Sequence, residues 1–187
     1  MRSQLKHRHL TTVHLAGKLD CKACHVRHLV SCTNCHFETL AKTGKRVALP
    51  VSGWHFLMNY QGKVTSANMQ TFVLPDNKTF VMFAPQFSHS VMKTGRACQE
   101  CHVTEAVAQA QSKTVKLLWL DQGEVRQATG AIPVASGVKY GLVFRDYKDG
   151  KWSVISNPVE PRIHYASFGE PLSEAQLERL SEPQHKK

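Results

Sequence analysis

The chain has 187 residues, which fits one domain or one domain with a small addition. With 42% hydrophobic and 20% charged residues it has the composition of an ordinary globular chain, and no apolar run reaches the roughly 20 residues of a membrane-spanning helix. The formal charge of +10 favours an acidic partner, but no nucleic-acid-binding motif accompanies it. Composition therefore argues against both a membrane span and a nucleic-acid partner.

The first distinctive segment, residues 21–36, contains two copies of the pattern Cys-x-x-Cys-His, and residues 98–102 are a third. If the five residues form one helical turn, positions i, i+3 and i+4 lie on one face. Two thiols then reach the two vinyl groups of one porphyrin, and the imidazole points at its iron from the same side. This pattern is typical of covalent c-type haem attachment. The predicted thioether cysteines are Cys21, Cys24, Cys32, Cys35, Cys98 and Cys101, and the predicted proximal iron ligands are His25, His36 and His102.

Other roles of cysteine pairs stay open, namely a zinc site, a disulfide framework and a dithiol redox motif. With 11 histidines in 187 residues, three chance histidines after three such pairs have a combined probability of about 0.0002. A zinc site that used the two adjacent pairs would need more closely spaced knuckles than usual and would leave the third pair unused. A thioredoxin-like motif needs one pair in a βαβ setting. Covalent haem is therefore the prediction, with zinc as the main alternative.

On these motifs the chain resembles the multihaem c-type cytochromes. A histidine shortly before a motif adds to the likeness, as with His14 before Cys21 and His89 before Cys98. The resemblance covers residues 14–102 well and residues 103–187 only faintly. It implies three haem c groups with their iron as cofactors, in what looks like the C-terminal part of a larger bacterial or archaeal cytochrome with more haems upstream.

The resemblance implies a multihaem cytochrome c-like fold. We expect a haem-packed core of short helices and irregular segments, with inserted β-hairpins, a small antiparallel β unit and a C-terminal helix. The predicted organisation is a trihaem-binding region at 1–112 with a β insertion at 47–84, followed by a small β-rich unit at 113–187 that ends in a helix. Because at most about 29 Å separates Cys24 from Cys32, the haems of the first two motifs are expected to be neighbours.

Local patterns predict the elements that follow the paired motifs. Strands are expected at 54–60, 71–74 and 79–83, the last two joined by a hairpin at 75–78. A short helix is expected at 103–111. Further strands are expected at 115–120, 139–144 and 152–155, with Asp149-Gly150 as a hairpin turn. Ser173 and Gln176 form the capping box of a last helix.

The second axial ligand of each iron decides between a carrier and a catalyst, because an open position permits substrate binding. Eight histidines lie outside the motifs, and three haems need three of them. The preferred distal ligands are His14, His89 and His55, with His164 and His28 in reserve. We expect bis-histidine ligation at all three haems.

Saturated irons predict low-potential electron transfer, by a carrier or a segment of a haem conduit, rather than catalysis. Two alternatives stay open: a reductase of a small nitrogen or sulfur oxyanion with one open-site haem, and a subunit of a cytochrome filament. An anion would be attracted by Lys42, Lys45, Arg46, Lys93 and Arg96. The expected partners are redox proteins, acidic ones included, and a further haem-bearing segment or subunit.

Haem attachment of this family's kind takes place outside the cytoplasm, so the resemblance implies a periplasmic or extracellular protein. Residues 1–9 are basic and lack the apolar core of a signal peptide. We therefore expect the export signal to be missing from this sequence, through a truncated start.

Overall fold

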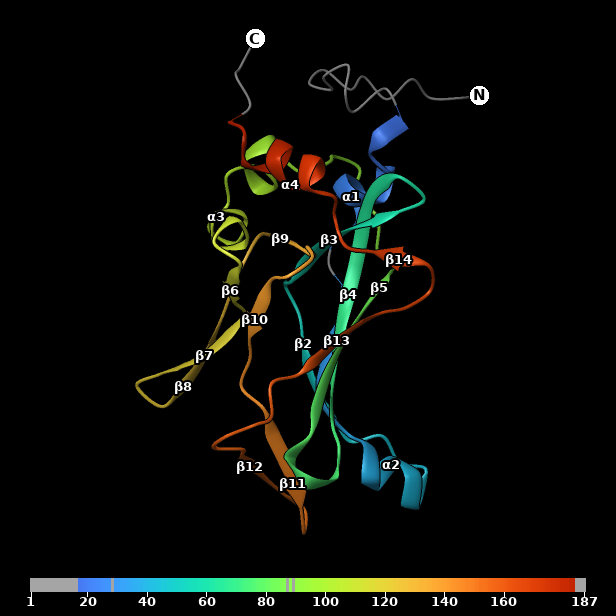
Figure 1. The fold of residues 1–187 in the computed structure, drawn as a ribbon. Coiled ribbons are helices and arrows are strands. Elements are labelled where there is room, and N and C mark those ends of the chain that lie inside the picture. The colour runs from blue at the N-terminus through green and yellow to red at the C-terminus, as the bar shows by residue number, and fades with distance from the viewer. Residues whose placement is uncertain (1–16, 28, 87, 89, 184–187) are drawn as a thin grey trace.

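The structure, a computed structural model, describes residues 17–27, 29–86, 88 and 90–183. It is mostly β, with 42% strand and 21% helix. The α-helices of the described part are α1 (Cys21–His25), α2 (Phe37–Thr43), α3 (Glu105–Gln111) and α4 (Glu174–Ser181). In Figure 1, α1, α3 and α4 gather at one end of the molecule and α2 lies at the other.

Eight strands form one mixed sheet. They are β1 (Ser31–His36), β2 (Leu49–Val51), β3 (His55–Tyr60), β4 (Lys63–Val73), β5 (Thr79–Pro85), β9 (Ala131–Pro133), β13 (Arg162–Tyr165) and β14 (Gly169–Glu170). Three two-stranded ribbons stand beside it: β6 (Thr114–Lys116) with β10 (Lys139–Gly141), β7 (Leu118–Asp121) with β8 (Glu124–Gln127), and β11 (Arg145–Lys148) with β12 (Lys151–Val154).

The sheet is built around β4, its longest strand. One edge of β4 pairs antiparallel with β5 along its second half, and the other edge pairs first with β3 and then, in parallel, with β1. Burial alternates along β5, as expected for a strand with one face on a core. Strand β4 therefore connects the α1 end of the molecule to the segment that carries the second motif.

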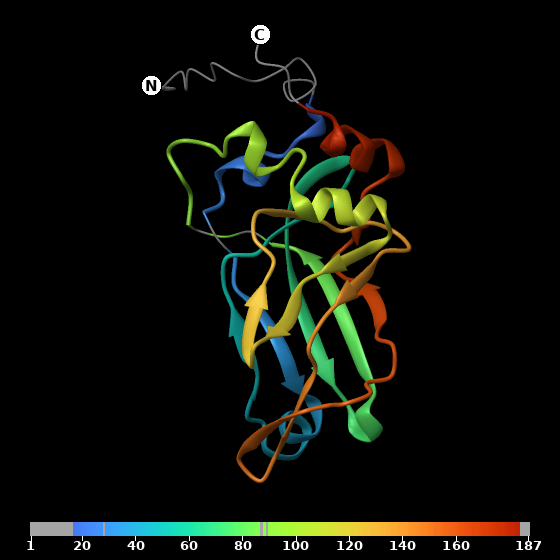
Figure 2. The same cartoon turned by 90° about the vertical axis from the view of Figure 1, so that its left-hand side faces the viewer.

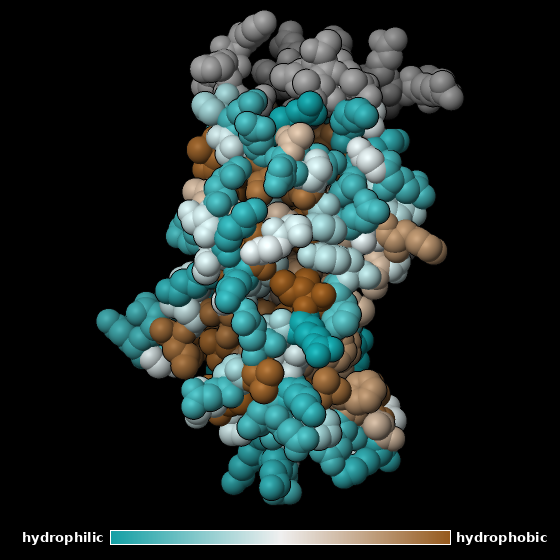
Figure 3. All heavy atoms as spheres, viewed as in Figure 1, coloured by the Kyte–Doolittle hydropathy of each residue, from teal (hydrophilic) through white to brown (hydrophobic). Residues whose placement is uncertain are grey.

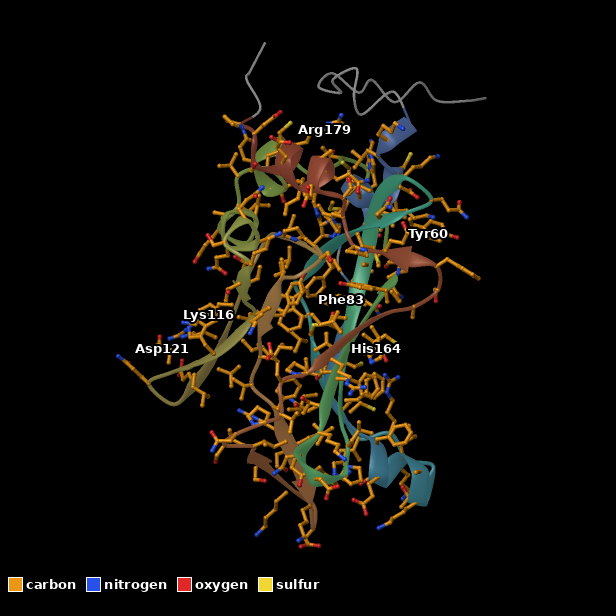
Figure 4. All side chains as sticks on the ribbon, in the orientation of Figure 1. Tyr60, Phe83, Lys116, Asp121, His164 and Arg179 are labelled. Atoms are coloured by element: carbon orange, nitrogen blue, oxygen red, sulfur yellow. The ribbon has the colours of Figure 1, made fainter. Side chains whose placement is uncertain are left out.

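The core lies between this sheet and the ribbons of residues 114–141, which stand in front of the sheet in Figure 2. Trp54, Phe56 and Phe83 are fully buried there, and the Phe56 and Phe83 rings meet edge to face at 5.3 Å between centroids. Figure 4 shows Phe83 in the middle of the molecule. On the face drawn in Figure 3, hydrophobic side chains form small patches among hydrophilic ones. The apolar residues of the strands therefore supply a core from protein side chains.

Several local predictions are confirmed. Strands β4 and β5 form the hairpin around residues 75–78, and β11 and β12 form the one at Asp149-Gly150. Asp149 and Gly150 both have left-handed φ, 50° and 77°, as a two-residue hairpin turn requires. The Ser173–Gln176 capping box starts α4. The helix expected at 103–111 is α3, which begins at Glu105.

The predicted multihaem cytochrome c-like fold, with a haem-packed core of short helices and irregular segments, is wrong. The centre of the molecule is the mixed eight-stranded sheet, and its aliphatic and aromatic side chains pack on each other. The small antiparallel unit is wrong too, because β6 and β10 pair in parallel, while β9, β13 and β14 join the sheet through β3 and β5. The division at residue 112 stays a prediction, although strands from both sides of it share the sheet.

Candidate haem-attachment sites

The first motif forms helix α1, which Asp20 caps. The Asp20 carboxylate accepts a hydrogen bond from the Lys22 amide at 3.0 Å. The helical turn places Cys21, Cys24 and His25 on one face. His25 Nδ1 donates to the Met92 carbonyl at 3.0 Å, since a carbonyl can only accept. The lone pair is then on Nε2, which is the arrangement of a metal-ligating histidine held by a second-shell contact. This motif fits haem attachment.

The third motif is also a helical turn. The 3-10 helix η3 (Cys98–Glu100) continues with a hydrogen bond from the His102 amide to the Cys98 carbonyl at 2.8 Å. His102 Nδ1 donates to the Arg179 carbonyl of α4 at 3.0 Å, and Figure 4 shows Arg179 at the α1–α4 end of the molecule. The ring is thus held as the His25 ring is held, with the lone pair on Nε2. This motif fits haem attachment as well.

The second motif has a different backbone, because it forms strand β1. Asn34, in its middle, has a left-handed φ of 55°. Cys35 is only 1% exposed. His36 contacts Asp146 through Nε2 at 2.8 Å and Thr39 through Nδ1 at 2.8 Å, so both ring nitrogens are engaged. The predicted helical turn is wrong here, and the motif as placed does not fit a haem.

Neighbours distant in sequence hold the second motif in this form. The Asn34 amide donates to Thr71 Oγ1 at 2.7 Å, and Asn34 Oδ1 accepts from the Arg145 amide at 2.9 Å. Strand β1 also pairs with β2 on one side and β4 on the other. Strand pairing and side-chain contacts therefore outweigh the local preference of the motif for a turn.

The first and third motifs lie against each other. The Arg96 amide, two residues before the third motif, donates to the Cys24 carbonyl at 3.1 Å. Burial raises the pKa of the Cys101 thiol to about 12; the nearby Cys24 thiol adds to this shift and Arg96 opposes it. Burial also raises the pKa of the Cys24 thiol, again against the charge of Arg96. Cys24 and Cys101 thus share one partly buried environment, while Cys21 is exposed.

His55 lies beneath the first motif and is 3% exposed. Its Nε2 donates to the Ala23 carbonyl at 2.8 Å, while its buried Nδ1 has no hydrogen-bond partner in the described part of the chain. Burial, reinforced by the positive charge of Arg96, lowers the pKa of His55 to about 4. The ring is therefore neutral near pH 7 and supports the backbone of the motif from below. Its role as a distal ligand stays a prediction.

Of the other predicted distal ligands, His164 lies far from the first and third motifs, and the remaining three lie outside the described residues. His164 lies exposed in β13, where its ring meets the Phe80 ring edge to face at 5.6 Å. Figure 4 shows His164 well away from Arg179, which lies at the end of the molecule that carries the third motif. His14, His89 and His28 lie outside the described residues. Among residues 17–183 as far as they are described, no three His, Cys, Asp or Glu side chains are placed to hold a metal ion.

The five basic residues expected to attract an anion do not form one cluster. Lys42 lies on α2 and pairs with Glu38, and Arg46 just beyond α2 donates to Gln70. Arg96 lies at the opposite end, beside α1 (Figure 1).

The described helices include none long and apolar enough to cross a membrane.

The sequence did not predict the contacts that three residues make with the motifs, although Arg96 was named there as an anion-attracting residue. Asp146 holds His36, and Arg96 lies between two motifs. Gly95 faces the His25 ring: a Cβ at this position would lie 3.3 Å from His25 Nε2 and 3.5 Å from Cys24 Cβ. The glycine three residues before Cys98 was the one signal available, because a missing side chain often marks a close approach.

Comparison with protein-family models, with curated proteins and with solved structures found no match to this chain.

Proposed function

We propose that the protein carries covalently attached c-type haem and transfers electrons. The observation that supports this most is the sequence itself, in which all six cysteines belong to three complete Cys-x-x-Cys-His motifs. The helical turns of the first and third motifs agree with it, since each sets two thiols and an imidazole on one face.

In this proposal the chain binds and orients while the haem iron supplies the redox change. Cys21 and Cys24 hold one porphyrin, and Cys98 and Cys101 hold another. His25 and His102 are the proximal ligands, each with its Nδ1 proton on a backbone carbonyl, which keeps Nε2 basic and its ring in place. We keep His14, His89 and His55 as distal ligands, with His164 and His28 in reserve.

A third haem, at Cys32, Cys35 and His36, completes the proposed set but requires a different backbone there. His36 would have to leave Asp146, and β1 would have to bend into a turn. We base no step of electron transfer on this motif.

The proposed physiological role is that of a low-potential carrier or a segment of a haem conduit, in the periplasm or outside the cell. Its partners would be redox proteins. The formal charge of +10 supports an acidic partner, because opposite charge speeds and orients encounter.

The test is the intact mass of the denatured protein after export in a host with a haem-attachment system, together with the reduced haem absorbance. We expect added mass in whole haem units, with peptide mapping that locates haem on residues 21–25 and 98–102. Replacement of both cysteines in the first or the third motif should remove one haem unit. An unmodified mass from a host that matures a control cytochrome would refute the proposal. Binding of carbon monoxide by the native protein would favour a reductase over a carrier.

A further inference from the structure

The segment that precedes the third motif runs along the first motif. The Arg27 amide donates to the Ser90 carbonyl at 2.9 Å, the Met92 amide to the His25 carbonyl at 2.7 Å, and the Arg96 amide to the Cys24 carbonyl at 3.1 Å. Val26 and Val91 form an antiparallel bridge within this pairing. Since these bonds join main chain to main chain, they fix the position of the two motifs independently of any one side chain.

A buried apolar cluster lies under both motifs. Ala23, inside the first motif, is fully buried in it together with Val107 of α3 and Leu180 of α4, and Cys101 packs against the same cluster. The Val103 amide, just after the third motif, donates to the Leu180 carbonyl at 2.9 Å. Helices α3 and α4 thus support the two motifs together, and Figure 2 shows both helices near α1 and the segment around η3.

Arg96 lies between the two motifs. Its amide donates to the Cys24 carbonyl at 3.1 Å, and it stands two residues before Cys98. The guanidinium is held in place by its own bond to the Arg27 carbonyl at 2.9 Å. A fixed positive charge shared by two redox sites would favour the reduced state of both iron centres, because reduction adds negative charge.

The second motif has none of these neighbours. Its described hydrogen bonds go to β4, to residues 39–49 and to residues 143–146. Strand β1, blue in Figure 2, leads away from α1 toward the α2 end of the molecule. The pairing expected from sequence separation, between the first and second motifs, is therefore not the one that the contacts favour.

We propose that the first and third motifs form one two-haem unit at the α1–α4 end, and that the second motif stands outside it. Cys21, Cys24 and His25 would hold one haem and Cys98, Cys101 and His102 the other. The bound haems would supply one-electron chemistry, and an electron could pass between them with no bond or proton changing place. Electrons enter from and leave to the redox partners of the proposed function, on which this inference rests.

Circular dichroism in the Soret region tests the unit, because two porphyrins held close together couple their transition dipoles and give a signal of two signs. The measurement uses the exported, haem-loaded full chain and three double variants: Cys21→Ala with Cys24→Ala, Cys32→Ala with Cys35→Ala, and Cys98→Ala with Cys101→Ala. Denatured mass counts the haems in each sample, and far-UV circular dichroism checks that each variant keeps its β structure. A variant that does not keep it is replaced by the Cys→Ser pair at the same motif.

We expect the two-signed signal in the wild type, its loss in both the first-motif and the third-motif variants, and its persistence in the second-motif variant. A haem-loaded wild type without this signal would overturn the two-haem unit and leave the proposed function intact. So would loss of the signal on removal of the second motif, or its persistence without the first or the third. Mass spectra that show no haem on any motif would overturn the proposed function and this inference together.

Discussion

The first and second motifs share one pattern and differ in nearly every structural respect. The first is a capped helical turn whose His25 ring is fixed by a backbone carbonyl. The second is a strand in the sheet, and its His36 ring is held at both nitrogens, by Asp146 and Thr39. The comparison shows that the five residues of this motif form a helical turn in one place and a strand in another. The strand forms where β2 and β4 take up the backbone hydrogen bonds of the motif. Each prediction below changes one side of this comparison.

The largest expected effect concerns His55, the buried support of the first motif. The unfolded chain takes up a proton on this ring below a pH of about 6.5, whereas burial in the folded chain delays protonation to a pH of about 4. This ring's contribution to stability is therefore complete above pH 6.5 and is lost as the pH falls from 6.5 to 4, by about 3 kcal/mol. Urea unfolding of the haem-free chain between pH 7.5 and 4 measures it.

The matched variants are His55→Gln and His164→Gln. The first should flatten the acid limb of the stability profile, because no titrating ring remains under the first motif. The second should leave the profile unchanged, because His164 is exposed. Identical profiles for the wild type and His55→Gln would mean that the buried ring does not titrate as described.

The second prediction concerns Asn34, in the middle of the second motif. Asn34→Ala should destabilise the fold by about 2 kcal/mol, because alanine is disfavoured at a φ of 55° and the Arg145 amide loses its acceptor. Asn34→Gly tolerates the backbone and should lose only about half as much. Chemical denaturation of the two variants separates these contributions.

Glu100→Ala, at the same place in the third motif, is the control. Glu100 is exposed and accepts one hydrogen bond, from the Ala97 amide at 2.7 Å. Its loss should change stability by well under 1 kcal/mol. An equal effect at the two positions would contradict the distinction between a motif held in the sheet and one at the end of the molecule.

The sequence predicted those features that depend on a few adjacent residues. The Ser173–Gln176 box, the Asp149-Gly150 turn and the helical form of the first motif all lie within five residues. The form of the second motif depends instead on Thr71 and Arg145, which lie 37 and 111 positions from Asn34.

The fold class failed for a similar reason. The motifs implied a core filled by haem. The core is instead filled by protein side chains, among them the aliphatic and aromatic residues of β3, β4 and β5. Alternation along a strand predicts which face is buried and does not say what covers that face. The contact between the first and third motifs could not be predicted either, because more than 70 residues of chain separate them.

The third prediction concerns the contact between Asp146 and His36. Asp146→Ala removes the carboxylate 2.8 Å from His36 Nε2 and should lower stability by about 1 kcal/mol. Haem occupancy of residues 32–36, measured by peptide mass relative to residues 21–25, should rise, because the His36 ring then keeps its hydrogen bonds with Thr39 but loses the one with Asp146. Glu160→Ala, which removes an exposed carboxylate that pairs with Lys139, is the control and should change neither quantity. Unchanged occupancy in Asp146→Ala would show that Asp146 does not restrict the second motif.

The smallest expected change in stability concerns Gly95, which faces the first motif. A methyl group there would lie 3.3 Å from His25 Nε2, closer than most such contacts, and the ring cannot readily swing away because Nδ1 is bonded to Met92. Alanine lowers the conformational entropy of the unfolded chain, and this gain offsets the cost of crowding in the folded chain. The free energy of unfolding should therefore change by less than about 1 kcal/mol.

The effect of Gly95→Ala should appear instead as lower haem occupancy of residues 21–25, with residues 98–102 unaffected. Gly141→Ala is the control, since its methyl group would meet only Lys116 and Val115 backbone atoms at an ordinary 3.6 Å. Equal occupancy of the two motifs in Gly95→Ala would mean that the space beside His25 is not needed for attachment. A parallel loss at both would instead indicate that Gly95 acts on the first and third motifs as one unit, because the main chain on its C-terminal side is bonded to Cys24 and leads directly to Cys98.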